Sequence, residues 1–67
     1  MNGTVRYQVE RTYENYITGS KWTFVFPKKY KTWRAAEAKA KTLRWTTMPE
    51  PGLSLDRSNA RVLEVPA

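Results

Sequence analysis

A single segment of this sequence, residues 33–44, has the composition of a helix, and it limits the fold to an arrangement around one helix. The segment contains five alanines or leucines and neither Gly nor Pro. Thr32 is a good N-cap because its hydroxyl can accept a hydrogen bond from a free amide of the first turn. The apolar residues recur at helical spacing and predict one buried stripe, formed by Trp33, Ala36, Ala40 and Leu43.

The residues before the helix predict two strands. Residues 4–13 alternate between apolar and polar side chains, which is typical of a half-buried strand. Residues 22–26 alternate in the same way until Pro27, which cannot donate to a ladder. Residues 14–21 are expected to connect the two strands, with Gly19 in the turn. The apolar faces of the strands hold Val5, Tyr7, Val9, Tyr13, Trp22, Phe24 and Phe26.

One further strand is predicted after the helix. Residues 45–59 are expected to be irregular, because two prolines and a glycine interrupt them and 56–59 has turn composition. Residues 61–65 are expected to lie antiparallel beside the first strand, which is long and needs a second partner. The order strand, strand, helix, strand predicts one small α+β domain over residues 1–67. It has two layers, a mostly antiparallel three-stranded sheet and one helix packed on one face.

The core is expected where the apolar strand faces meet the helix stripe. Ala36 and Ala40 are small, so the helix can lie close to large aromatic side chains of the sheet. Arg11 interrupts the apolar face of the first strand, and a snorkelling side chain would explain its position. The other sheet face must meet water or a partner. The predicted core consists of Val5, Tyr7, Val9, Trp22, Phe24, Phe26, Trp33, Ala36, Ala40 and Leu43.

The residue types that are missing exclude several functions. The 67 residues include no Cys and no His, which leaves no disulfide, no thiolate metal site and no histidine base. The carboxylates are scattered and the three glycines lie far apart, so neither a calcium loop nor a phosphate-cradling loop is present. We expect no enzymatic activity, no metal and no cofactor. No apolar run is as long as a membrane span, and residues 1–6 contain no apolar stretch of signal-peptide length. We therefore expect a cytoplasmic protein without membrane contact.

The positive charge is concentrated in one segment. The chain has a formal net charge of +6. Residues 28–44 hold seven Lys and Arg against Glu37 alone, whereas the rest of the chain is balanced. A basic cluster of this kind is typical of a phosphate-binding surface, and the alternative is an ordinary solvated helix face. The predicted phosphate contacts are Lys28, Lys29, Lys31, Arg34 and Lys41.

Aromatic residues lie beside these charges in the sequence, at Tyr30, Trp33 and Trp45. Exposed aromatic rings can stack on nucleic-acid bases, and an exposed aromatic sheet face can bind single strands. A chain this small has few other residues from which to build a core, however. Trp33 and the aromatic residues of 22–26 are therefore expected to be buried, and Trp45 is expected to be a shelf for the C-terminal segment.

Residues 30–40 resemble the aromatic-x-Thr entry and Ala/Glu-rich helix of the arm-site DNA-binding domains of phage integrases. The resemblance covers residues 4–44. It implies a three-stranded sheet backed by one helix, with the sheet face opposite the helix entering the major groove of DNA. On that reading, the residues that face the bases are Arg6, Gln8, Thr12 and Thr23.

Two classes of function remain. The first is a small basic nucleic-acid-binding module whose phosphate contacts lie in residues 28–44. Its expected ligand is double-stranded DNA rather than RNA, and its expected origin is a phage or mobile element. The second is a small phage-type effector that binds and inhibits or redirects a host protein through an open strand edge or sheet face. A homodimer is also expected, because a chain without disulfides gains core by pairing.

Overall fold

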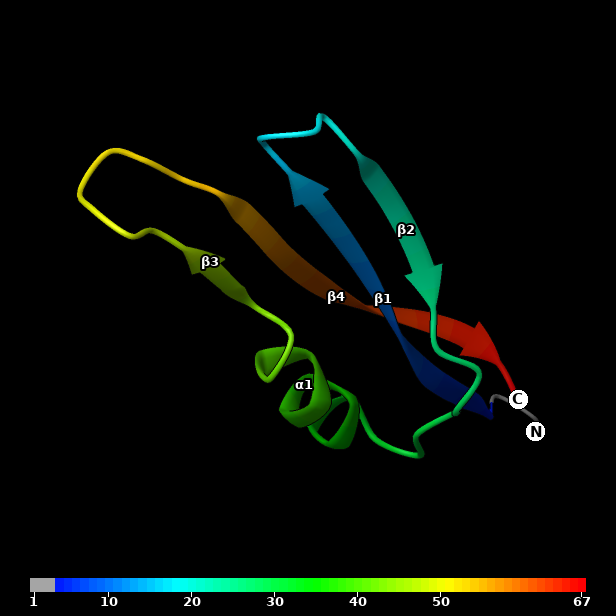
Figure 1. Ribbon diagram of the computed structural model, residues 1–67. Helices are drawn as coiled ribbons and strands as arrows, with labels where there is room; N and C mark the ends of the chain where they lie inside the picture. Colours follow the sequence, from blue (N-terminus) through cyan, green and yellow to red (C-terminus); the bar gives the residue numbers. More distant parts are fainter. Residues whose placement is uncertain (1–3) are drawn as a thin grey trace.

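The computed structural model describes residues 4–67, so residues 1–3, where the segment examined for a signal peptide begins, lie outside the described part. Two strands, β1 (Val5–Asn15) and β2 (Lys21–Val25), precede the helix α1 (Trp33–Lys41). Two more strands follow it, β3 (Trp45–Thr47) and β4 (Asp56–Pro66). They form one antiparallel sheet in the order β2-β1-β4-β3 (Figure 1). The α+β class is confirmed, but the prediction of three strands is wrong because there are four.

The central pair of the sheet is β1 with β4. The pairing runs from Val5 opposite Pro66 to Asn15 opposite Asp56, along the full length of both strands. The predicted antiparallel position of the C-terminal strand beside the first strand is therefore confirmed. The prediction of irregular structure for 45–59 is wrong at both ends. Residues 45–47 form β3, and β4 begins at residue 56. The polar residues that resemble a turn in the sequence are in the strand because Asp56 and Ser58 accept hydrogen bonds from side chains of β1.

The helix begins as predicted and ends three residues early. The Thr32 hydroxyl accepts a hydrogen bond from the backbone N–H of Ala35 at 3.2 Å, which caps the first turn. At the other end, the Thr42 hydroxyl donates to the carbonyl of Lys39 at 2.7 Å, and the backbone tightens into i→i+3 bonds. Arg44 then donates from Nε to the carbonyl of Ala60 at 3.0 Å, which directs the chain onto β4.

The fully buried core is small. Val9, Ala36, Ala40 and Ala60 are buried where α1 crosses β1 and β4. The two helix alanines allow the backbone of α1 to approach the sheet, as the sequence predicts. Partly buried side chains surround this centre, namely Tyr7, Phe26, Tyr30, Leu43 and Val62.

Three residues of the predicted core are exposed. Trp22, Phe24 and Trp33 keep 45%, 48% and 54% of their surface in solvent. Trp22 and Phe24 do lie on the face that α1 covers, because they pair with Tyr13 and Arg11, which are two and one alternations from buried Val9. A nine-residue helix is only about 14 Å long, whereas an eleven-residue strand is about 36 Å long. The helix therefore cannot cover the whole face.

This mismatch in length determines the shape of the molecule. The principal extents are 52 × 20 × 14 Å. In Figure 1, α1 lies beside one half of the sheet, and the β1–β2 and β3–β4 connections project from the other half. The face that α1 covers in part is called the helix face below, and the opposite one the open face. Within residues 4–67, no helix has the length and apolar character needed to cross a membrane.

Candidate nucleic-acid interface

The basic connector between β2 and α1 is held to the sheet at two points. At its start, the backbone N–H of Phe26 donates to the carbonyl of Val9 at 2.9 Å. Further along, Tyr30 and Tyr7 exchange two backbone hydrogen bonds, of 2.7 and 2.9 Å. Lys28, Lys29 and Lys31 flank this second anchor and are exposed. Their side chains therefore project from a backbone that is fixed to β1.

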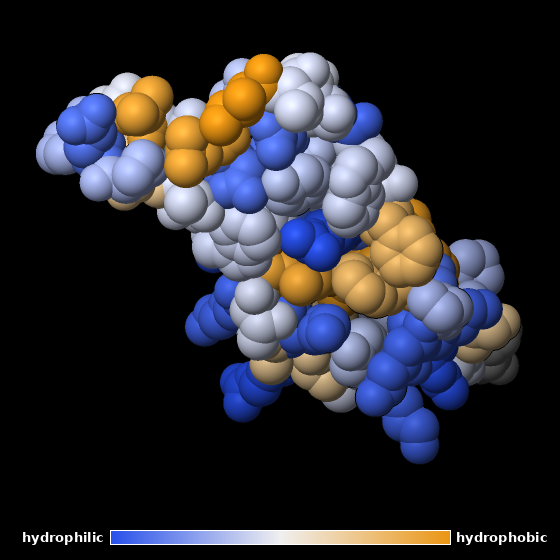
Figure 2. Space-filling view, in the orientation of Figure 1, coloured by the Kyte–Doolittle hydropathy of each residue, from blue (hydrophilic) through white to orange (hydrophobic). Residues whose placement is uncertain are grey.

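The two helical residues of the predicted site, Arg34 and Lys41, are also exposed. They lie on the side of α1 away from buried Ala36 and Ala40. Figure 2 shows hydrophilic side chains gathered over the part of the molecule where Figure 1 places α1 and the connector. All five predicted phosphate contacts are thus exposed, three on the connector beside β1 and two on the outer side of α1. We call these five residues the basic layer, and their binding role stays a prediction.

The charges in this layer are not neutralised by acidic partners. Within residues 4–67 there are two ion pairs, Arg44 with Glu37 and Arg61 with Glu10, and neither uses a predicted phosphate contact. The Arg44–Glu37 pair has two parallel hydrogen bonds, one of them 2.8 Å from Nη2 to Oε1. That bond lowers the pKa of the Glu37 carboxyl. Glu37 is the one acid of the basic segment, and Arg44 engages it. The charge of Lys41 also helps to lower the pKa of Glu37, whereas the other four predicted contacts have no ion-pair partner within residues 4–67.

The open face holds the residues that the integrase resemblance assigns to base reading. Arg6, Gln8 and Thr12 alternate on β1 on the side opposite Val9, and Thr23 is paired with Thr12, their hydroxyl oxygens 3.4 Å apart. Gln8 is partly engaged, since Nε2 donates to the carbonyl of Phe26 at 3.2 Å. The fold brings these four residues to one face, but their role in reading bases stays a prediction.

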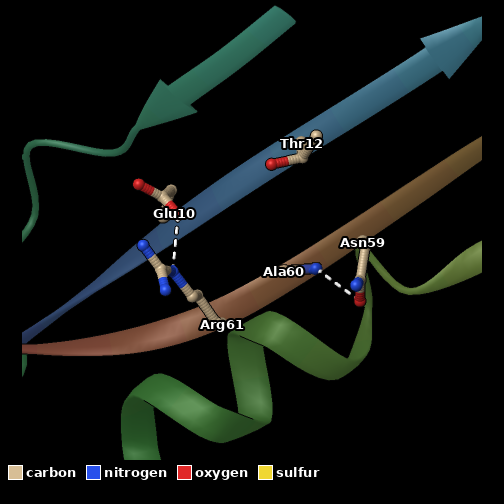
Figure 3. Close-up of a pocket in the computed structure, with 5 residues that line it drawn as sticks. All are labelled: Glu10, Thr12, Asn59, Ala60 and Arg61. Atoms are coloured by element: carbon tan, nitrogen blue, oxygen red, sulfur yellow. Dashed lines mark hydrogen bonds and ion pairs between the residues drawn. The ribbon is translucent and has the colours of Figure 1, made fainter. Parts of the chain in front are cut away.

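The sequence did not predict the contribution of β4 to this face. Arg57, Asn59 and Arg61 alternate there opposite Glu14, Thr12 and Glu10. A shallow depression of about 200 Å³ lies between the two strands (Figure 3). In it the side chains of Glu10 and Arg61 point toward each other, with Oε1 and Nε 2.6 Å apart. The sequence shows no alternation that would have found them, because polar side chains occupy both faces at the start of β4, with Asp56 and Ser58 opposite in direction to Arg57 and Asn59.

The helix face carries a cluster that was also not predicted as a site. Arg11 lies among Tyr13, Trp22 and Trp45, with its guanidinium carbon 5.8, 5.2 and 5.8 Å from the three ring centroids. We call these four residues the aromatic–arginine cluster. The sequence signal for this cluster was Arg11 itself, a charged residue at an apolar position of a strand. The cluster was not predicted because β3, the strand that supplies Trp45, was missing from the prediction.

Comparison with known proteins adds no relative to this description, because no family model, no curated protein and no solved structure matches the chain. Within residues 4–67, no group of three or more acidic side chains is arranged to hold a metal ion.

Proposed function

We propose that the protein is a small non-enzymatic nucleic-acid-binding module that holds the phosphates of double-stranded DNA with its connector and the outer side of α1. The observation that supports this proposal is the position of five exposed cations on an anchored connector and one side of a short helix, none of them in an ion pair within residues 4–67. Phosphate contacts of this kind position a protein on DNA but do not read its sequence. Binding through them alone would be weakly specific.

Salt dependence tests the proposal, because each phosphate contact releases counterions from the DNA. A fluorescent duplex is titrated with the protein at several salt concentrations, and log affinity is plotted against log salt. Each contact contributes about 0.9 to the slope. Replacing Lys28, Lys29 and Lys31 together by Ala should flatten the slope by about 2–3. The fold should survive, because all three side chains are exposed.

The matched control replaces the same three lysines by Arg, which keeps the charge at each position. Its slope should equal that of the parent protein. A triple-alanine variant that binds duplex DNA with an unchanged slope would show that the phosphate contacts lie elsewhere. A parent protein that binds no nucleic acid at low salt would overturn the proposal altogether.

A protein-binding effector is the second candidate, and the free sheet edge supports it. β2 forms one edge of the sheet and all five of its residues are exposed, so a partner strand could pair with it. This function predicts no nucleic-acid binding at physiological salt. It also predicts that Thr23→Pro, which removes a backbone donor from the edge strand, abolishes capture of a host protein.

A further inference from the structure

The aromatic–arginine cluster lies in a row that crosses the whole sheet. Tyr13 of β1 is opposite both Trp22 of β2 and Ser58 of β4, and Ser58 is opposite Trp45 of β3. The row lies on the helix face, beyond the region that α1 covers. The Tyr13 ring stacks on Trp22, with centroids 5.5 Å apart, and meets Trp45 edge-on at 6.3 Å. Small, buried Ser58 leaves space between the rings.

Arg11 fills that space in a fixed orientation. Its Nε donates to the Ser58 hydroxyl at 2.8 Å, and three aromatic rings surround the guanidinium. Within residues 4–67 its two terminal nitrogens have no hydrogen-bond acceptor, although the side chain is half-buried. The cluster therefore presents two preoriented donor nitrogens, each with two N–H groups, between two tryptophans, which are 45% and 40% exposed.

This combination favours a flat ligand that has acceptors on its edge or an anionic group beside it. Any of the nucleobases can stack on an exposed tryptophan. A carbonyl oxygen or ring nitrogen of the base, or an oxygen of the adjacent phosphate, can then accept a hydrogen bond from the guanidinium. Lys41, the last residue of α1, precedes Trp45 by four residues, so this end of the basic layer is next to the cluster along the chain. Phosphates on the basic layer and bases on the cluster would belong to one strand.

Two other occupants fit less well. A second copy placed across a two-fold axis at the cluster would bring Arg11 against its own symmetry mate, which is unfavourable in a desolvated interface. Asp56 lies on this face, but its Oδ2 accepts from the Tyr13 hydroxyl at 2.9 Å and its Oδ1 is buried, so neither oxygen is open to that second Arg11. In duplex DNA the bases are stacked inside the helix and cannot reach Trp22 or Trp45.

We infer that the aromatic–arginine cluster is a binding site for unpaired nucleobases. This inference rests on the proposed nucleic-acid function and narrows it, because the preferred ligand then contains a single-stranded segment. Bases stack on Trp22 and Trp45, Arg11 holds an acceptor between them, and the basic layer holds the adjacent phosphates.

The test compares three variants of one residue type. A short labelled oligothymidine and a labelled duplex are each titrated with Trp22→Ala, Trp45→Ala and the control Trp33→Ala, whose side chain is exposed on α1 outside the cluster. Loss of one stacked base should weaken single-strand binding by about 5- to 150-fold for the first two variants. Their duplex affinity and salt slope should not change, and Trp33→Ala should bind both ligands like the parent.

Trp22→Leu replaces Trp22→Ala in the titration if the alanine variant melts below the assay temperature, because leucine keeps the apolar bulk but has no ring to stack. The leucine variant should lose single-strand affinity as well. If duplex binding keeps its lysine-dependent slope while the Trp22 and Trp45 variants bind oligothymidine like the Trp33 variant, this inference fails and the proposed function stands. If those variants lose self-association in sedimentation and keep their single-strand affinity, the cluster is a protein interface and the inference is overturned. If the parent binds neither ligand, both proposals fail.

Discussion

Val9 is the one large side chain in the described residues that is completely buried, and its truncation tests whether the small core holds this fold. It lies at the centre of β1, beneath Ala36 and Ala40 of the helix and beside Ala60 of β4. Val9→Ala removes two buried methyl groups. At about 0.8 kcal/mol per group, the lost transfer free energy is about 1.6 kcal/mol. The cavity adds about 0.5–1 kcal/mol, because the short alanine neighbours cannot fill it.

The expected loss of about 2–2.5 kcal/mol is large for a domain of this size. A single core of fewer than 70–80 residues rarely provides more than about 3–5 kcal/mol of net stability. The melting temperature should fall by about 8–20 °C, measured by circular dichroism. Denaturant titration should show the same loss as a lower midpoint with an unchanged slope.

Val25→Ala is the matched control for this prediction. Val25 lies on edge strand β2, points to the open face and is 40% exposed. The same substitution there should cost only about 0.5 kcal/mol, because most of the side chain contacts water in both states. Equal losses at the two positions would refute the reasoning, since the stability would then not come from the contact between α1 and the sheet.

Three more predictions concern β4, an ion pair and a turn. Deleting residues 60–67 should unfold the chain, because these residues include buried Ala60 and pair with more than half of β1, and an unchanged amide spectrum would contradict this. Arg44 lowers the pKa of Glu37, so their pair stabilises the fold fully above the ordinary glutamate pKa of about 4.3. This stabilisation is lost as the pH falls through the lower folded-state pKa of Glu37. Glu37→Gln should therefore reduce the drop in melting temperature between neutral and acidic pH. An identical drop in the parent and the variant would count against a stabilising role of the pair. Gly19→Ala should cost about 1–2 kcal/mol because the residue has φ +78°, although an added Cβ meets no atom within 4 Å, and an unchanged denaturant midpoint would show that the turn adapts.

The sequence predicts which face each strand residue occupies, but not how much of that face is covered. Trp22 and Phe24 were placed on the correct face of the sheet and were nevertheless wrong as core residues. Alternation determines the side of a strand, whereas coverage depends on the length of the element opposite. The helix is also shorter than predicted: it ends at residue 41 and not at residue 44, and Thr42 just after it forms a local hydrogen bond to the carbonyl of Lys39. It therefore covers even less of the sheet face.

The prediction missed β3 and the first half of β4 for a different reason. β3 has three residues, too few for alternation to be recognised, and it exists because β4 offers it an edge. The first residues of β4 are polar because their partners are polar: Ser58 accepts from Arg11, and Asp56 accepts from Tyr13. The exposure of the five predicted phosphate contacts was easier to predict, because exposed charge depends on local sequence rather than on distant pairing.

The pairing of β1 with β4 has a consequence for how the chain reaches its folded state. Val5 and Pro66 are neighbours in the sheet but lie at almost opposite ends of the 67 residues. During synthesis, the β1–β2 hairpin can form before β4, the longer partner of β1, has been made. Until β4 is made, β1 has one free edge and Val9 has no complete cover. Long-range pairing of this kind favours folding in milliseconds to seconds rather than microseconds. During this interval the hairpin is exposed to proteases and to pairing with other chains.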